Sequence, residues 1–344
     1  MNGRWKIIGA VAAVLLIAGA SYALLAAGNR AGTPPMITYS ADAYVRESNT
    51  LLTSFSSYTG YRTAPAIGGG SYSDARTIGQ GAPADVFISV SLGSYAQSYL
   101  KSRFSGWALA IASDQLVIAY SNSTLLSPSA KSFISQFQNS LPDNSSSVEL
   151  SAFTNLTNGK VKIGIANPLD DPAGLRGWLA LEIAGYLYAG GNTSYFTDRA
   201  VHNNANVSAP SASALVAPLE TGNIQFLFIY KSAAVAKGLR YLPLPPAVNQ
   251  GNSSMSSFYG MFTYNLPDGP VSGSPIYLFV TVLANSTEAR AAYAFLDFVV
   301  NNSAVLSSFG MAPLSTSVLF SSLPLPLEIS RLVSTGRVVQ GGSL

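Results

Sequence analysis

The sequence of 344 residues contains no cysteine and a single histidine. The absence of cysteine excludes disulfide bonds, thiol catalysis and cysteine-ligated metal sites. The one histidine, His202, stands in the run VHNNANVS, with no nucleophile motif such as G-x-S-x-G near it. We therefore expect His202 to be a solvated loop residue, and we expect neither a histidine-based catalytic relay nor a histidine-rich metal site.

Charged residues are also scarce, at 10% of the chain, with a net charge of +3. In soluble proteins, about a quarter of all residues are usually charged. No basic cluster stands out, so nucleic acid is not an expected partner. A surface with few carboxylates suits an acidic exterior, where salt bridges lose their anions, and we expect the chain to stay folded in acid.

The one long apolar stretch lies at the N-terminus. Arg4 and Lys6 precede an uncharged run over residues 7–27, which is long enough to cross a bilayer. The preceding basic residues place the following chain outside the cytoplasm. Residues 18–20 (AGA) also fit a cleavage pattern, so residues 1–30 are expected to be either a signal peptide or a membrane anchor. Both alternatives predict an extracytoplasmic protein that is secreted or anchored at the cell surface.

The rest of the chain contains N-x-S/T sequons, which are acceptor sites for glycans in an exported protein. They begin at Asn122, Asn144, Asn155, Asn192, Asn206, Asn252, Asn285 and Asn301. We therefore expect a glycoprotein.

Strand-like and helix-like segments alternate along the chain. The expected strands are 36–41, 58–67, 84–90, 114–122, 160–168, 223–230 and 274–285, and the expected helices are 46–58, one that begins near residue 71, 172–189 and 286–302. Residues 121–159 are rich in Ser and Asn around one helical segment. The alternation predicts a parallel α/β layout in two lobes, with the chain crossing between them near residues 116 and 277.

Ligands of open α/β sheets bind beyond the carboxyl ends of the strands, at helix N-termini. The expected cleft is therefore lined by residues 39–44, 68–71, 167–172 and 230–232. Glycines 68–70 lead into Ser71, where exposed backbone amides and a hydroxyl favour an oxyanion.

The stretch ANPLDDPAGLRGW, residues 166–178, allows two interpretations. Asp171 is a good N-cap before Pro172, and Asp170 favours the positive end of the helix that follows. The alternative is a pair of carboxylates, Asp170 and Asp171, that performs acid–base chemistry in a secreted hydrolase. Adjacent residues point in different directions, and no partner base is visible, so we favour the cap.

Several stretches in order resemble one known family. IANPLDDPAGLRGWLALEIAGYLY, LETGNIQFLFIYKSAAVAKGLRYLPLP and SGSPIYLFVTVLANSTEARAAYAFLDFVV are similar to the substrate-binding proteins of molybdate/tungstate ABC transporters, especially the archaeal tungstate-binding branch. The resemblance runs from about Met36 to Pro313. It implies a class II periplasmic-binding-protein fold with two α/β lobes joined by a hinge, lobe I from residues 31–115 plus 276–344 and lobe II from 116–275.

The resemblance also implies a function and partners. It implies a monomer without enzymatic activity or cofactor that captures tungstate or molybdate and delivers it to a membrane permease. Carried over by position, the carboxylate ligand of the tungsten or molybdenum centre falls on Asp171, the tyrosine on Tyr230 and a serine on Ser71. A hard W(VI) or Mo(VI) centre accepts such oxygen donors.

Two positions depart from the family pattern. The first-loop serine is replaced by Asp42-Ala43, where Ala43 offers only its amide, and the family's glutamate ligand falls near Ala212 in the run PSASAL. Either Asp42 supplies the second carboxylate oxygen, or the anion stays tetrahedral with hydrogen bonds from Ser211 or Ser213. A third alternative is that the ligand is another oxyanion, such as sulfate or phosphate. A different hypothesis on the function is that the protein is a surface adhesin.

Overall fold

The computed structural model describes residues 34–140, 146–267 and 269–344. The expected signal peptide or anchor at residues 1–30 and the sequon at Asn144 lie outside these ranges. Within them, no helix combines the length and the apolar character needed to cross a bilayer.

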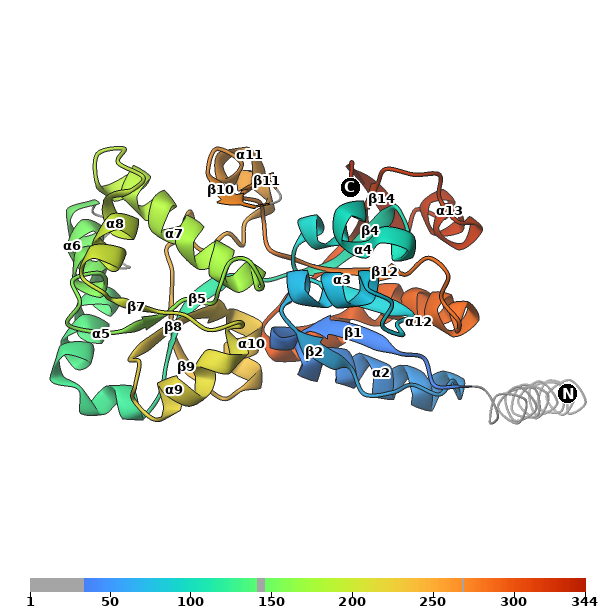
Figure 1. Ribbon diagram of the computed structural model, residues 1–344, viewed down its shortest axis with the longest axis horizontal. Helices are drawn as coiled ribbons and strands as arrows, with labels where there is room; N and C mark the ends of the chain where they lie inside the picture. The colour runs from blue at the N-terminus through green and yellow to red at the C-terminus, as the bar shows by residue number, and fades with distance from the viewer. Residues whose placement is uncertain (1–33, 141–145, 268) are drawn as a thin grey trace, which may run out of the picture.

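Two lobes, each built around its own sheet, lie side by side along the long axis of the molecule (Figure 1). The sheet of lobe I has the order β14-β13-β4-β12-β3-β1-β2. Its strands are β1 (Thr38–Ala41), β2 (Ile67–Gly69), β3 (Val86–Ser89), β4 (Trp107–Ser113), β12 (Tyr277–Val282), β13 (Ala312–Ser321) and β14 (Val338–Gly342). β1 pairs in parallel with β2 and β3, whereas β12 runs antiparallel to β3 and β4, so the sheet is mixed.

The sheet of lobe II has the order β7-β6-β8-β5-β9. Its strands are β5 (Leu116–Tyr120), β6 (Ile163–Gly164), β7 (Asn206–Val207), β8 (Phe226–Tyr230) and β9 (Arg240–Pro243). A separate hairpin, β10 (Thr263–Leu266) with β11 (Gly269–Ser272), packs against the long helix α7 (Pro172–Tyr188). Strands β5 and β8 are buried along their whole length, which explains their continuous apolar sequences LVIAY and FLFIY.

Helices cover both sheets. The other α-helices are α2 (Val45–Thr59), α3 (Ser71–Gly79), α4 (Gln97–Leu100), α5 (Pro128–Ser140), α6 (Ser146–Leu156), α8 (Tyr195–His202), α9 (Val216–Glu220), α10 (Lys231–Ala236), α11 (Ser256–Tyr259), α12 (Ala289–Asn302) and α13 (Leu327–Ser334). The 3-10 turns are η1 (Asp42–Tyr44), η2 (Leu92–Tyr95), η3 (Lys101–Arg103), η4 (Ser123–Leu126), η5 (Ser213–Leu215), η6 (Ser253–Met255) and η7 (Ser303–Phe309).

Two chain segments cross between the lobes side by side. The first joins β4 to β5 through Asp114, and the second runs from Gln250 to Ile276 before β12. The amide of Asp114 donates to the carbonyl of Ile276 at 3.0 Å, and the amide of Ile276 donates to the carbonyl of Gln250 at 2.9 Å. These paired crossings form a hinge between the two sheets.

The carboxylate of Asp114 connects the hinge to both lobes. Its Oδ2 accepts a hydrogen bond from the hydroxyl of Tyr44 in lobe I at 2.8 Å, and another from Ser232 at the start of α10 in lobe II. Burial raises the pKa of Asp114 to about 6, although these hydrogen bonds oppose the rise. A single buried carboxyl therefore fixes the approach of the two lobes at the hinge.

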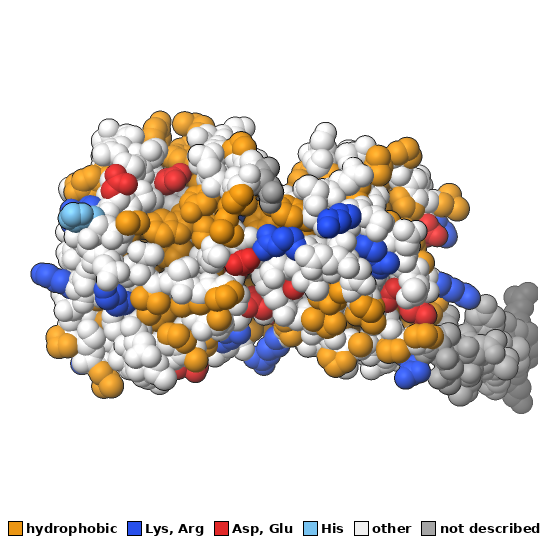
Figure 2. All heavy atoms as spheres, in the orientation of Figure 1, with side chains coloured by type: hydrophobic (Ala, Val, Ile, Leu, Met, Phe, Trp, Pro, Cys, Tyr) orange, Lys and Arg blue, Asp and Glu red, His pale blue; other side chains and the backbone are white. Residues whose placement is uncertain are grey.

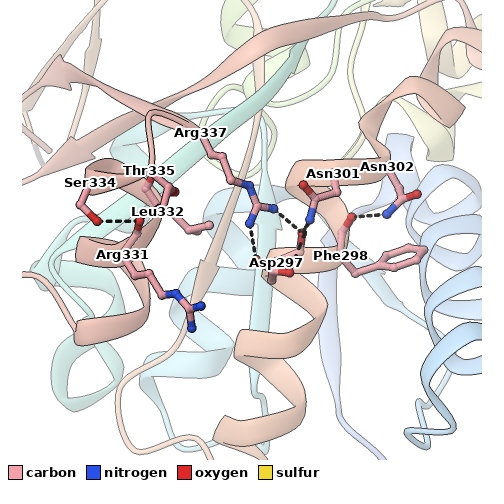
Figure 3. Close-up of polar contacts among 9 residues, drawn as sticks. All are labelled: Asp297, Phe298, Asn301, Asn302, Arg331, Leu332, Ser334, Thr335 and Arg337. Atoms are coloured by element: carbon pink, nitrogen blue, oxygen red, sulfur yellow. Dashed lines mark hydrogen bonds and ion pairs between the residues drawn. The ribbon is translucent and has the colours of Figure 1, made fainter. Parts of the chain in front are cut away.

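The C-terminal segment is attached to lobe I by polar contacts around α12 (Figure 3). Arg337, at the entry to β14, forms an ion pair with Asp297 at 2.9 Å. Asn301 donates to the backbone carbonyl of Asp297 at 2.8 Å. This cluster lies on the exposed side of lobe I.

Some expected elements differ from the observed ones. The strand expected over residues 58–67 is wrong: only Ile67 belongs to β2, and residue 63 forms an isolated bridge to Met36. The one helical segment expected within residues 121–159 is in fact two helices, α5 and α6. His202 ends α8 and is exposed, so it is solvated as expected but is not a loop residue.

Candidate functional site

The candidate site lies where the loops after β1, β2, β6 and β8 face one another from the two lobes. Lobe I contributes Asp42 and Ala43 after β1 and residues 68–71 between β2 and α3. Lobe II contributes Asp171 directly before α7 and Tyr230 at the end of β8. The fold thus gathers residues that are far apart in the sequence, because the carboxyl ends of these strands meet at one edge of each sheet.

The glycines before Ser71 permit two close approaches. A Cβ on Gly69 would lie 2.1 Å from Oδ1 of Asp74, and one on Gly70 would lie 2.3 Å from the carbonyl oxygen of Asp170. The amide of Tyr72 donates to the same carbonyl at 3.2 Å. Because Asp170 belongs to lobe II, Gly70 marks a point where the two lobes touch, and the cleft is closed in this structure.

Two buried hydroxyls at the site have no hydrogen-bond partner among the described residues. Ser71 and Tyr230 are both 0% exposed, and neither Oγ of Ser71 nor the phenol oxygen of Tyr230 forms a hydrogen bond of good geometry. Buried polar atoms are normally paired. These two hydroxyls come from opposite lobes, and each is available to donate a hydrogen bond.

Asp171 caps α7, as the sequence predicts. Its Oδ1 accepts from the amide of Ala173 at 2.8 Å, and its Oδ2 accepts from the amide of Ala212 at 2.8 Å. The side chain is buried, and burial together with the nearby charge of Asp42 raises the pKa of Asp171. Each carboxylate oxygen still has a lone pair for a further contact.

Three carboxyl groups converge on the glycine loop, and one of them, Asp74, is missed by the sequence reasoning. Burial raises the pKa of Asp74 to about 8, and the charges of Asp42 and Asp171 add to the rise. Its Oδ2 has no partner among the described residues. Asp74 follows Ser71 by three positions, the S-x-x-D spacing of a helix start, which is a signal that could have found it.

The segment before α9 supplies backbone and hydroxyl groups. The amide of Ala212 is used by Asp171, and Oγ of Ser211 accepts from the amide of Ala214 at 3.2 Å. In contrast, Oγ of Ser213 is buried without a partner among the described residues. Of the two serines expected to donate here, Ser213 is therefore the one whose buried hydroxyl has neither a donor nor an acceptor beside it among the described residues.

Sequence reasoning also misses Arg176, which lies in α7 five positions after Asp171. Its side chain is only 4% exposed. The guanidinium donates to Oε1 of Gln250 at 3.1 Å and to Oγ of Ser274 at 2.9 Å. A lone basic residue in the apolar helix PAGLRGWLALEIAGYLY gives no sequence signal of a buried site.

Asp170 joins the lobes instead of pairing with Asp171. Its Oδ1 lies 2.6 Å from Nη2 of Arg76 on α3, and its Oδ2 accepts from Asn167 at 2.8 Å. Arg76 also donates to the carbonyl of Leu169 at 3.2 Å. Figure 2 shows acidic and basic side chains meeting where the two lobes face each other. The contacts of Arg76 with Asp170 and Leu169 thus connect the two lobes across the cleft.

Within the described ranges, no three side chains of His, Cys, Asp or Glu are arranged to hold a metal ion. A metal oxyanion brings its own oxygen shell, and it requires hydrogen-bond donors and at most one or two added oxygen ligands. The unpaired hydroxyls and the nearby carboxyl groups provide such a set.

Comparison with known proteins relates the chain to solute binding. A family model described as bacterial extracellular solute-binding protein matches residues 39–312. An uncharacterized solute-binding protein of Sulfurisphaera tokodaii is 36% identical over 318 residues, which cover 90% of this chain and 83% of that protein.

Two solved structures resemble the fold. The periplasmic molybdate-binding protein of Azotobacter vinelandii aligns with a TM-score of 0.55 and 17% identity, covering 84% of this chain and 100% of that one. The sulfate-binding protein SubI of Mycobacterium tuberculosis aligns with a TM-score of 0.57 and 14% identity, covering 90% and 93%. At such identities the likeness shows the fold alone, and it confirms the expected two-lobed binding-protein fold.

Proposed function

The chain belongs to the family of bacterial extracellular solute-binding proteins, and within this family we propose that it captures tungstate or molybdate. The oxyanion binds between the lobes and is handed to the permease of an ABC transporter. Closure of the lobes about the hinge encloses it.

The observation that carries the proposal is the pair of unpartnered hydroxyls. Ser71 and Tyr230 lie in a closed interface between lobes, where an unused buried donor is costly. A tetrahedral oxyanion accepts hydrogen bonds from several directions, and it can be held by both lobes at once. Such a ligand satisfies the two donors, and it does so only when the cleft is closed.

The carboxyl groups at the site favour a metal oxyanion over sulfate. Asp42 and Asp171 repel a sulfate dianion when they are ionised, whereas Asp74, whose pKa is raised to about 8, is protonated at neutral pH and adds no negative charge. A W(VI) or Mo(VI) centre instead accepts a carboxylate oxygen as an additional ligand, and Asp171 is the residue proposed for this contact. The fold shared with a molybdate-binding protein supports this choice, whereas the fold shared with SubI keeps sulfate as the second candidate. Phosphate differs from sulfate because it carries a proton at neutral pH, and this proton can donate a hydrogen bond to a carboxylate.

The same geometry argues against a secreted hydrolase. Asp170 is engaged by Arg76 and Asn167, and both oxygens of Asp171 accept backbone amides. Neither carboxyl group is paired with a base, and the single histidine is exposed at the end of α8. A binding role explains these contacts, and an acid–base dyad does not.

We place the binding domain outside the cytoplasm, where this family works. The apolar residues 7–27 serve as its signal or its anchor. Of the sequons within the described ranges, those at Asn122, Asn192, Asn252, Asn285 and Asn301 are exposed and are the preferred glycan sites. Mass spectrometry of the protein from its native cells tests both points through the mature N-terminus and the glycan masses.

Thermal unfolding with a panel of tungstate, molybdate, sulfate and phosphate tests the proposal, because a ligand that binds only the folded state raises the unfolding temperature. The expected order is a larger shift with tungstate and molybdate than with sulfate or phosphate. A shift with sulfate alone would show that the ligand is sulfate and not a metal oxyanion. A shift with none of the four anions would refute oxyanion capture.

X-ray absorption on the tungstate-loaded protein tests the role of the carboxylates. If Asp171 and Asp42 both reach the metal, longer W–O distances appear beside those of the tetrahedral anion. If they do not, a four-oxygen shell shows that the anion is held by hydrogen bonds alone, and Ser213 becomes the preferred additional donor.

A further inference from the structure

Arg176 is a buried positive charge that no described carboxylate neutralises. The ion pairs among the described residues are Arg76 with Asp170 and Arg337 with Asp297. A buried charge is costly unless it is paired. Burial lowers the pKa of Arg176, as expected for a cation that is removed from solvent.

The neighbours of Arg176 connect it to the site and to the hinge. Its guanidinium donates to the side chains of Gln250 and Ser274 and to the carbonyl of Ser274, and Nε2 of Gln250 donates back to the carbonyl of Arg176 at 2.9 Å. Both partners belong to the segment that crosses between the lobes. All these acceptors are neutral, so they orient the guanidinium without cancelling its charge.

The positive charge of Arg176 acts electrostatically on two tyrosines near the site. The charge of Arg176 lowers the pKa of Tyr230 against the large rise caused by burial, and it acts in the same direction on Tyr72. The phenol oxygen of Tyr230 lies within reach of this guanidinium as an acceptor, while its own proton has no acceptor among the described residues. A nearby cation makes that hydroxyl a stronger hydrogen-bond donor toward an anion.

We infer that Arg176 is a specificity-determining positioning residue that makes the site prefer a doubly charged oxyanion over a singly charged one of the same shape. The inference rests on the proposed function, because it concerns the same bound anion. Arg176 acts through Tyr230 and through its field across the closed cleft. The crossing segment holds its guanidinium in place before the ligand arrives, so no reorganisation is needed on binding.

The test compares tetrahedral anions that differ in charge. Calorimetric titration measures tungstate and molybdate, which carry two charges, against perrhenate, which carries one. The variants are Arg176→Gln, which removes the charge, and Arg176→Lys, which keeps it. Arg337→Gln is the matched control, since it removes an arginine that is paired with Asp297 far from the site.

The preference for tungstate over perrhenate is expected to fall at least about tenfold in Arg176→Gln, because one charge at short range in a buried site is worth that much or more. Arg176→Lys retains most of the preference, and Arg337→Gln retains all of it. The readout is the change in this ratio between the unmodified protein and each variant, because a contribution from metal–carboxylate bonds, which tungstate and perrhenate form to different extents, is common to all the proteins and cancels in that comparison.

A purely structural role gives a different result, because it weakens both anions equally in Arg176→Gln and leaves the ratio unchanged. That outcome overturns the inference while leaving tungstate binding by the unmodified protein intact. If Arg176→Gln does not fold, the unmodified protein still decides: equal affinity for tungstate and perrhenate overturns the inference. Failure of the unmodified protein to bind any oxyanion instead refutes the proposed function.

Discussion

At the scale of single residues, binding and stability are expected to depend on different groups. The two hydroxyls proposed to donate to the anion have no partner within the described protein, so they contribute little to folding. Asp171, in contrast, holds a helix start and a neighbouring segment in place. Substitutions at these positions therefore separate the two properties.

Ser71→Ala and Tyr230→Phe should each weaken tungstate binding by about tenfold to a hundredfold, because a hydrogen bond to a charged group contributes about 1.5–3 kcal/mol. The unfolding temperature of the ligand-free protein should stay the same or rise, since each change removes an unpaired buried hydroxyl. Calorimetric titration and thermal unfolding measure the two effects.

Tyr95→Phe is the matched control for Tyr230→Phe. Its hydroxyl is also buried in an aromatic environment, but it donates to the carbonyl of Phe87 at 3.2 Å within lobe I. This change should lower stability by about 1 kcal/mol and leave tungstate affinity unchanged. The reverse pattern, with affinity lost in Tyr95→Phe and kept in Tyr230→Phe, would contradict the assignment of the donor.

Asp171→Ala should lower the free energy of unfolding by about 1–3 kcal/mol, because it removes the N-cap of α7 and leaves the amide of Ala212 unpaired. Chemical denaturation measures the loss. Asp170→Ala should cost less, since Asp170 is partly exposed and its ion pair with Arg76 is screened by solvent. Equal losses in the two variants would show that Asp171 does not serve as a buried cap.

At the scale of elements, the sequence predicts several long helices well, and at α7 it also predicts the residue that caps the helix. The helix expected over 172–189 is observed as α7 over Pro172–Tyr188, with the aspartate cap and Pro172 at its start. The helices expected over 46–58 and 286–302 are observed as Val45–Thr59 and Ala289–Asn302. Amphipathic spacing and caps are local signals, so the sequence carries them directly.

Strand boundaries are predicted less well, because pairing with distant segments decides them. Residues 58–66 favour strand by composition, yet the strand beside β1 is the glycine-rich Ile67–Gly69. Glycine has low strand propensity, and its value here is the close approach it allows. The lobe boundaries at 115/116 and 275/276 stay predictions, and so do the roles of the individual site residues.

The contact between α3 and the loop before α7 gives a prediction at this scale. Gly70→Ala should hinder closure of the lobes, because the new Cβ would lie 2.3 Å from the carbonyl oxygen of Asp170. Tungstate affinity should fall at least about tenfold with little change in the stability of lobe I. Small-angle scattering should show a larger radius of gyration for the variant in saturating tungstate.

Gly260→Ala serves as the control, since the nearest atom to its added Cβ is at 3.4 Å, an ordinary contact. This variant should bind and close like the unmodified protein. If Gly70→Ala also binds and closes normally, the close contact at Gly70 does not limit closure.

At the scale of the whole molecule, buried carboxyl groups with raised pKa values set the response to pH. Burial raises the pKa of Glu47 to about 7, that of Asp74 to about 8 and that of Asp114 to about 6. In the unfolded chain these groups titrate near pH 4. Between about pH 4 and 8 the folded protein therefore binds more protons than the unfolded chain.

Stability should consequently be greatest near pH 4 and decline as the pH rises toward 8, because folding stability falls with pH wherever the folded state binds more protons. The change should be on the order of a few kcal/mol, measured by thermal unfolding of the ligand-free protein. Asp114→Asn should flatten the part of the curve between about pH 4 and 6, whereas the exposed Asp297→Asn should not. A stability that rises from pH 4 to 8 would contradict the prediction.

The central claim is that the closed cleft between the two lobes holds one tetrahedral metal oxyanion, with Ser71 and Tyr230 as its donors from opposite sides. Calorimetric titration of tungstate into the unmodified protein and into the Ser71→Ala/Tyr230→Phe double variant tests it most directly. The account predicts saturable binding of one anion per chain, lost in a double variant that remains folded. Equal binding by the two proteins, or no binding of tungstate or molybdate to the unmodified protein, would contradict it.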